Sequence, residues 1–130
     1  MRKGEETTHQ ALLNSIIDAI ASKKGCEVLS LELGLLPNSF CEYFVICHAE
    51  STTQVEAIAD NVEVTITQVH GEKPWRKVGF ENKLWIVLDY LDVVVHVFQT
   101  QARRYYKLEA LWADAPCHLY NDQPIGQKAI

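Results

Sequence analysis

The feature that most constrains the fold is the apolar stretch at positions 84–112, LWIVLDYLDVVVHVFQTQARRYYKLEALW, in which the hydrophobic period changes once. Positions 84–90 alternate between two faces, as a half-buried strand does. Positions 93–98 are almost continuously apolar, which is typical of a strand covered on both faces. Because only the Tyr90-Leu91 dipeptide separates the two runs, the pattern predicts two strands joined by a tight hairpin.

From Thr100 onward the spacing becomes helical. One face of the predicted helix is apolar and is expected to pack on the core, namely Tyr105, Leu108, Leu111 and Trp112. At about 100° per residue, Tyr106 and Glu109 point away from that stripe. They indicate either a contact surface or an ordinary amphipathic helix with one stray exposed aromatic residue.

The rest of the chain predicts an α-β-β-α-β-β-α order. Its expected elements are a helix from a cap at Thr7 or Thr8 to Lys24, strands at 26–33 and 43–47, and a helix from Ser51 or Thr52 to His70. A loop or irregular edge is expected at 71–80 and a loop-like tail from Ala115. We therefore expect an α+β (mixed α/β) domain at 1–114, built on a single mixed β-sheet flanked by helices, with a C-terminal tail at 115–130.

The composition bounds the function. A chain of 130 residues with 48% hydrophobic and 22% charged residues is one globular domain. Its net charge of −5 makes it a poor candidate for direct DNA binding, since that affinity comes largely from Lys and Arg on phosphates, and favours a basic protein partner. No apolar run approaches the roughly 20 residues that span a bilayer, and no secretory signal is recognisable, so we expect a cytoplasmic protein without membrane contact.

The four cysteines, Cys26, Cys41, Cys47 and Cys117, form no CxxC pair. We expect them to be reduced and largely buried. Cys47 and His48 are adjacent on a predicted strand and so point to opposite faces, which argues against a shared metal ion. No metal or other cofactor is therefore expected.

Four ordered segments resemble the ribosomal silencing factor (Iojap-related) family: YFVIC from Tyr43, STTQVEAIAD from Ser51, WIVLDYLDVVVHVF from Trp85 and RRYYKLEALW from Arg103. The resemblance implies a mixed-sheet fold similar to a degenerate nucleotidyltransferase domain. It also implies binding to large-subunit ribosomal protein fourteen, a basic protein at the subunit interface, which blocks joining of the small subunit and represses translation. Homodimers are common in the family, so a homodimer is expected.

The resemblance also points to six partner-binding residues: Trp85, Asp89, Tyr90, Asp92, Tyr106 and Glu109. Trp85 and Tyr106 would be apolar anchors, and the carboxylates would meet basic groups of the partner. The alternatives are that Trp85 packs under a helix as an ordinary sheet residue, and that the two aspartates serve the hairpin turn.

The chain departs from the family pattern at three places. His48-Ala49-Glu50-Ser51 replaces a glycine-containing turn similar to TGTS, and Val78 stands where the family often carries Glu. Leu91 occupies a glycine position of the hairpin, where a positive φ would cost on the order of 1 kcal/mol. His96 is expected to be a satisfied core or interface group whose titration, if it is semi-buried, tunes binding near neutral pH.

Two rival functions remain. A nucleotidyltransferase-like enzyme or nucleotide-binding protein would need a phosphate-cradling glycine turn and paired carboxylates for divalent metals, and the sequence shows neither. The other rival is a dimerisation module with no ribosomal role. We therefore expect a binding protein that is not an enzyme.

Overall fold

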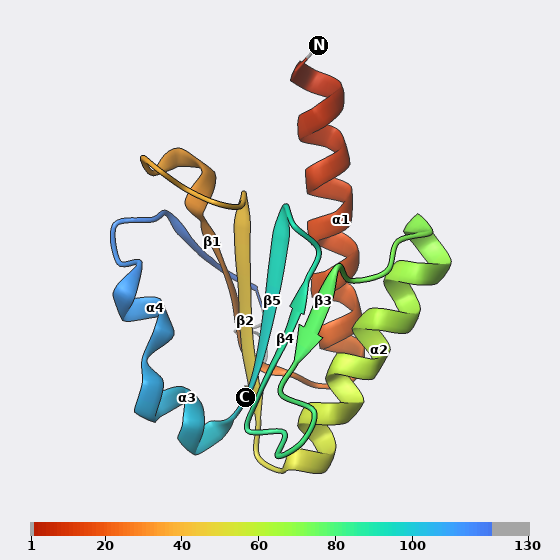
Figure 1. Cartoon of the computed structure of the whole chain (residues 1–130), viewed down its shortest axis with the longest axis vertical. Helices are drawn as coiled ribbons and strands as arrows, with labels where there is room; N and C mark the ends of the chain where they lie inside the picture. Colours follow the sequence, from red (N-terminus) through yellow and green to blue (C-terminus); the bar gives the residue numbers. More distant parts are fainter. Residues whose placement is uncertain (1, 121–130) are drawn as a thin grey trace.

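The computed structural model describes residues 2–120, with side chains from His9 onward, and holds one six-stranded sheet with helices on both faces (Figure 1). In chain order the elements are α1 (Arg2–Ser22), β1 (Cys26–Glu32), the 3-10 helix η1 (Leu33–Leu35), β2 (Tyr43–Ala49), α2 (Thr52–His70), β3 (Arg76–Val78), β4 (Trp85–Asp89), β5 (Val93–Gln99), α3 (Thr100–Tyr106), α4 (Leu108–Leu111) and β6 (Cys117–Leu119).

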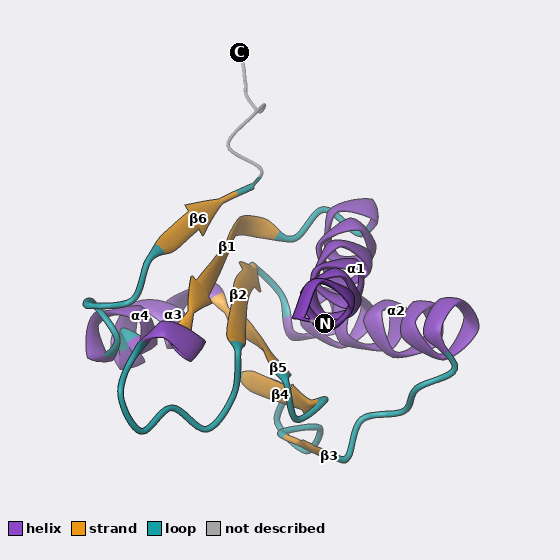
Figure 2. Cartoon of the chain, turned by 90° about the horizontal axis from the view of Figure 1, so that it is seen from above, coloured by secondary structure: helices purple, strands orange, loops and turns teal. Residues whose placement is uncertain are grey.

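The sheet is mixed, with strand order β3-β4-β5-β2-β1-β6. The central strands β2 and β5 run parallel, and the other neighbours are antiparallel. Figure 2 shows α1 and α2 on one face and α3 and α4 on the other. The predicted α+β fold with a single mixed sheet flanked by helices is confirmed.

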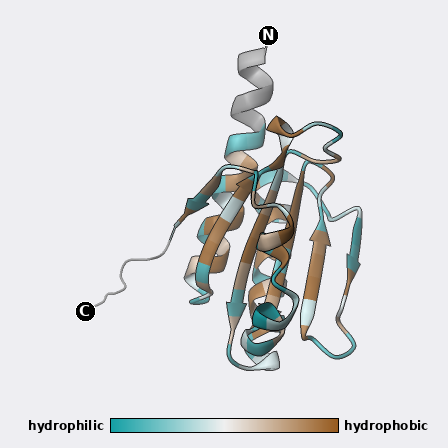
Figure 3. Cartoon of the chain, turned by 90° about the vertical axis from the view of Figure 1, so that its left-hand side faces the viewer, coloured by the Kyte–Doolittle hydropathy of each residue, from teal (hydrophilic) through white to brown (hydrophobic). Residues whose placement is uncertain are grey.

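The α1/α2 face carries the larger part of the core. Alternate residues of β2, β4 and β5 point into it, as does one apolar face of each of the two helices. Its members from α1 are Leu12, Leu13, Ile16, Ile17, Ala19 and Ile20. In Figure 3 the central strands are hydrophobic along most of their length. This face fixes the register of β4, so that Trp85, Val87 and Asp89 must point to the opposite side.

The α3/α4 face has a second and smaller core. Its buried members are Leu29, Leu31, Leu33, Cys41, Phe44, Ile46, Val94, Phe98, Leu108 and Ala115. Only short helices lie over it, and Trp85 and Val87 remain half-buried at its β4 end. This incompletely covered part of the sheet is where the candidate site lies.

The two long helices were predicted with different accuracy. For α2 the prediction is confirmed, because the Ser51 hydroxyl accepts from the Gln54 N–H at 3.1 Å and Gly71 ends the helix in the left-handed region. The predicted start of α1 is wrong, since that helix begins at Arg2. The threonines at positions 7 and 8 are therefore inside the helix and do not cap it.

The predicted continuous helix from Thr100 to Trp112 is also wrong. Lys107 adopts a left-handed conformation (φ 49°) and separates α3 from α4. The predicted core stripe is not buried throughout, since Tyr105, before the break, and Leu111, after it, are 80% and 73% exposed. Arg103 occupies the buried position beside β1 instead.

The segment after Ala115 contains a strand that we did not predict. This strand, β6 (Cys117–Leu119), pairs with Leu29–Leu31 of β1 and forms one edge of the sheet. The expectation of a loop-like tail is therefore wrong for these three residues, and the rest of the tail from position 121 lies outside the described residues. Within residues 2–120, no helix combines the length and hydrophobicity that a membrane span needs.

Candidate functional site

Trp85 lies at the centre of an aromatic group on the α3/α4 face. Its indole stacks on Phe98 of β5, with centroids 4.8 Å apart and planes inclined by 27°. Tyr106 of α3 packs against it from outside, at 4.9 Å, and is itself 51% exposed. The structure therefore brings together the two predicted aromatic anchors from separate elements, with one edge open to solvent.

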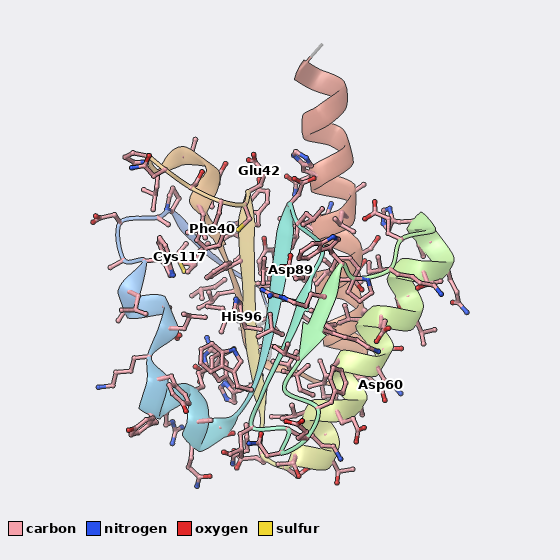
Figure 4. The ribbon with its side chains drawn as sticks, viewed as in Figure 1. Phe40, Glu42, Asp60, Asp89, His96 and Cys117 are labelled. Atoms are coloured by element: carbon pink, nitrogen blue, oxygen red, sulfur yellow. The ribbon has the colours of Figure 1, made fainter. Side chains whose placement is uncertain are left out.

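His96 holds the indole from within the sheet. The Trp85 Nε1–H donates to His96 Nδ1 at 3.0 Å (the histidine is labelled in Figure 4). The histidine side chain is only 6% exposed, and burial lowers its pKa to about 3. The imidazole is buried and not semi-buried, so the condition for its titration to tune binding near neutral pH is not met.

The prediction that His96 is a satisfied core group is correct at one nitrogen only. An indole N–H can only donate, so Nδ1 must present its lone pair and the proton of the neutral ring must sit on Nε2. That Nε2 is buried, and nothing in the described part of the chain offers it an acceptor. The Phe44 ring packs against the imidazole, with centroids 4.5 Å apart and planes inclined by 62°.

A further aromatic contact continues the group toward the loop before β2. Trp112 meets both Phe40 and Phe44 at 5.9 Å in edge-on geometry. Phe40 is largely exposed, whereas Phe44 is buried. These rings join the end of α4 to the sheet, and Phe44 connects them to His96.

Asp89 lies on the same face of β4 as Trp85, four residues further along the strand, with Val87 between them on that face. We refer to Trp85, Val87, Asp89 and Tyr106 as the β4 face. One carboxylate oxygen of Asp89 accepts from the Leu91 N–H at 2.8 Å. Leu91 has φ 73°, so the hairpin does require the conformation that glycine would adopt without strain. Asp89 thus stabilises the hairpin turn, which was the alternative to partner contact, and it also supplies negative charge to the β4 face.

Two of the predicted contact residues lie away from this face. Tyr90 is 5% exposed and belongs to the core beneath α1 and α2, where burial raises the pKa of its phenol. It is therefore unsuited to direct contact with a partner. Asp92 forms a 3.1 Å pair with His9 of α1, and its carbonyl accepts the backbone N–H groups of Glu42 and Tyr43.

Glu109 is partly exposed and forms an ion pair with the buried Arg103. One of its carboxylate oxygens accepts from Nε of Arg103 at 3.2 Å, and its second oxygen is buried without a hydrogen-bond partner within residues 2–120. Arg103 also donates to the Glu27 carbonyl at 2.9 Å and lies 2.9 Å from His48 Nδ1. Burial and the Arg103 charge both lower the pKa of His48, which keeps it neutral as an acceptor.

We refer to Arg103 with its partners Glu109, His48 and the Glu27 carbonyl as the arginine centre. It borders a cavity of about 320 Å³, whose lining also includes Arg104 and Lys107. Sequence reasoning placed Glu109 on a contact surface because it assumed an unbroken helix. The αL residue Lys107 instead turns Glu109 back toward Arg103. A non-glycine residue in that conformation leaves no strong signal in a single sequence.

The four cysteines are all free; Cys41 and Cys47 are buried, whereas Cys26 and Cys117 are exposed. The expectation that they are largely buried is therefore correct for two of them. Cys47 points into the α1/α2 core, while His48 contacts Arg103. No group of three or more His, Cys, Asp or Glu side chains with metal-binding geometry occurs in the portion the structure describes.

Comparison with known proteins gives a consistent result. Residues 6–129 match the family described as ribosomal silencing factor during starvation. The chain is 38% identical to ribosomal silencing factor RsfS of Halalkalibacterium halodurans, over 84% of this chain and 92% of that protein. It is 36% identical to the RsfS of Bacillus subtilis, over 82% of this chain and 89% of that protein. A 36% match to the chloroplastic protein Iojap of Zea mays covers 56% of this chain and 31% of that protein.

Solved structures share both fold and sequence. A crystal structure of a Chromobacterium violaceum protein superposes with a TM-score of 0.75 at 31% identity, covering 80% of this chain and 85% of that one. A Bacillus halodurans crystal structure gives a TM-score of 0.72 at 37% identity, covering 84% and 97% of the two chains. From the family match across 6–129 and these relatives, we conclude that the chain belongs to the ribosomal silencing factor family.

Proposed function

We propose that this protein represses translation by binding the large ribosomal subunit through its β4 face and sterically preventing the small subunit from joining. Large-subunit ribosomal protein fourteen is the proposed partner. The observation that carries the proposal is the paired Trp85 and Tyr106 rings, at 4.9 Å, on an incompletely covered sheet face with Asp89 beside them. Family membership supports a role in ribosome-associated regulation of translation.

The β4 face has the chemistry of a protein-binding centre. Aromatic side chains that are already held by packing give large contact area at a small entropic cost, and such residues dominate many interfaces. Asp89 and the net charge of −5 complement a basic partner and accelerate encounter with it. Val87, half-buried between Trp85 and Asp89, extends the apolar part of the surface.

Binding without catalysis is the simpler account of the carboxylates. In an enzyme of the nucleotidyltransferase type, Asp89 and Asp92 would have to converge on the divalent metals. Here Asp89 accepts from the Leu91 N–H, whereas Asp92 pairs with the His9 imidazole. We propose that the protein acts as a cytoplasmic, non-enzymatic factor, that it forms homodimers, and that it binds neither DNA nor membranes.

Cosedimentation with isolated large and small ribosomal subunits tests the proposal. The wild-type protein should pellet with the large subunit alone. Tyr106→Ala should weaken binding about tenfold, as truncation of an interface anchor commonly does. Asp89→Asn should weaken it several-fold while keeping the acceptor for the Leu91 N–H.

Matched controls lie on α2, on the opposite side of the sheet. Val69→Ala removes an exposed apolar side chain, and Asp60→Asn removes an exposed carboxylate. Both variants should bind like the wild type. Failure of the wild-type protein to bind the large subunit would contradict the proposed function, and equal losses in all four variants would contradict the assignment to the β4 face.

A further inference from the structure

We propose that His96 is a positioning residue, which holds the Trp85 indole in the orientation that the ribosomal partner contacts. This inference rests on the proposed function of the β4 face. It follows from the 3.0 Å bond between Trp85 Nε1–H and His96 Nδ1, together with the burial of the histidine beneath the surface. His96 itself does not touch the partner.

The geometry restrains the indole from three directions. In the β4–β5 register Trp85 is opposite Phe98, and Val87 is opposite His96, so Trp85 and His96 are diagonal neighbours on one face. Phe98 stacks beneath the ring and Tyr106 lies across it. Those two contacts allow the ring to slide in its plane, whereas the directional hydrogen bond to His96 fixes where the Nε1 edge lies.

The fold alone does not require a histidine at this position. Its neighbours Val94, Val95, Val97 and Phe98 are all buried apolar residues, and His96 leaves its own Nε2–H without an acceptor among the described residues. An apolar side chain would avoid that unmet hydrogen bond. His96 is thus a locally unfavourable group, and its one polar contact within the described residues is with Trp85, which points to a role through Trp85.

A purely structural role and a positioning role predict opposite behaviour of His96→Leu. If the histidine served only stability, the variant would melt at lower temperature and its binding loss would follow its unfolding. A positioning residue gives a variant that melts no lower than the wild type and yet binds the large subunit about threefold to tenfold more weakly, the worth of one typical hydrogen bond. His96→Asn should recover most of the affinity, because the Asn Oδ1 is an acceptor attached to Cγ, as Nδ1 is in histidine.

A double-mutant cycle with Trp85→Phe isolates the coupling. The phenylalanine has no N–H to donate, so His96→Leu should cause no additional loss of affinity in that background. His118→Leu is the matched control, because His118 lies on β6 at the far edge of the sheet, and it should bind like the wild type. Affinities are measured with isolated large subunits.

Proton NMR of the indole separates this inference from the proposed function. In the free wild-type protein the Trp85 Nε1–H should exchange slowly and show contacts to the Phe98 and Tyr106 rings, and in His96→Leu the exchange should accelerate and the contacts change. An indole that is unchanged in His96→Leu, or an equal loss of affinity with and without Trp85, would overturn the positioning role. If the wild-type protein did not bind large subunits at all, the proposed function would fail, and the NMR comparison would still decide whether His96 orients Trp85.

Discussion

The indole N–H of Trp85 donates to Nδ1 of His96 at 3.0 Å, and this bond connects a half-buried surface residue to a ring inside the sheet. It also fixes the protonation state and tautomer of the histidine, since a ring that accepts at Nδ1 is neutral and carries its proton on Nε2. The burial of His96 makes the charged form unfavourable in the folded state. The pair therefore has a measurable consequence for stability.

The first prediction concerns acid pH. The pKa of His96 is about 3 in the folded protein and about 6.5 when unfolded, so the unfolded chain binds the proton more readily. The stability due to the neutral ring is complete above pH 6.5 and is lost as the pH falls from 6.5 toward 3, by at most about 1.4 kcal/mol per pH unit. Urea unfolding at pH 7, 5.5 and 4.5 should show a steeper decline in the wild type than in His96→Leu. Parallel declines would contradict the buried neutral histidine.

The second prediction concerns Gly79, which lies close against the backbone of Trp85. Gly79 has φ 93°, and a Cβ there would meet the carbonyl group of Trp85. Gly79→Ala should lower the free energy of unfolding by at least about 2 kcal/mol, because both the conformation and the close approach exclude a side chain. Gly71→Ala is the control: its φ is 68°, but nothing lies within 4 Å, so it should cost only about 1 kcal/mol. Equal costs in thermal unfolding would refute the close-approach argument.

The third prediction concerns the buried arginine. Arg103→Ala removes the donor for Glu109 and for the Glu27 carbonyl, and should destabilise the fold by about 3 kcal/mol. The adjacent Arg104 is exposed, so Arg104→Ala should change stability by less than about 0.5 kcal/mol. Denaturant unfolding of the two variants compares an inward and an outward arginine on the same short helix. A similar effect of both substitutions would show that the arginine centre does not stabilise the fold.

The fourth prediction concerns the hairpin. Leu91 is exposed and has φ 73°, which costs a leucine about 1–2 kcal/mol. Leu91→Gly should therefore raise the free energy of unfolding by about 0.5–1 kcal/mol, part of the relief being offset by the greater entropy of glycine in the unfolded chain. Leu91→Ala keeps the Cβ and should give no increase. A gain in the alanine variant as large as in the glycine variant would place the effect in the leucine side chain and not in the backbone.

Periodicity predicted most of the sheet and α2. The alternation in β4 assigned Trp85, Val87 and Asp89 to one face, and the structure confirms it because the buried Ile86 and Leu88 fix the register. Positions 63–67, EVTIT, alternate and are rich in β-branched residues, a pattern that favours a strand, yet they lie inside α2. Tertiary packing of Val62 and Ile66 against the sheet outweighs the β-branched local preference.

The candidate site was only partly predictable. The sequence indicated that Trp85 and Tyr106 are surface aromatics, but not that they contact each other or that His96 accepts from the indole. The contact of Tyr106 with Trp85 depends on where α3 ends, and the αL conformation of Lys107 sets that end, whereas the bond to His96 depends on the β4–β5 register. The same break explains why Glu109, which an unbroken helix would point away from the core, lies against Arg103. A three-residue segment such as Cys117–Leu119 likewise becomes a strand only because the edge of β1 is available to it.

The most direct test of the central claim is a subunit-joining measurement by light scattering. Large subunits are incubated with increasing amounts of the protein, small subunits are added, and the rise in scattering reports the joined ribosome. We predict that the wild-type protein suppresses the rise in a concentration-dependent way, that Tyr106→Ala needs about tenfold more protein for the same effect, and that Val69→Ala behaves like the wild type. Full joining in the presence of wild-type protein that is bound to the large subunit would contradict the account.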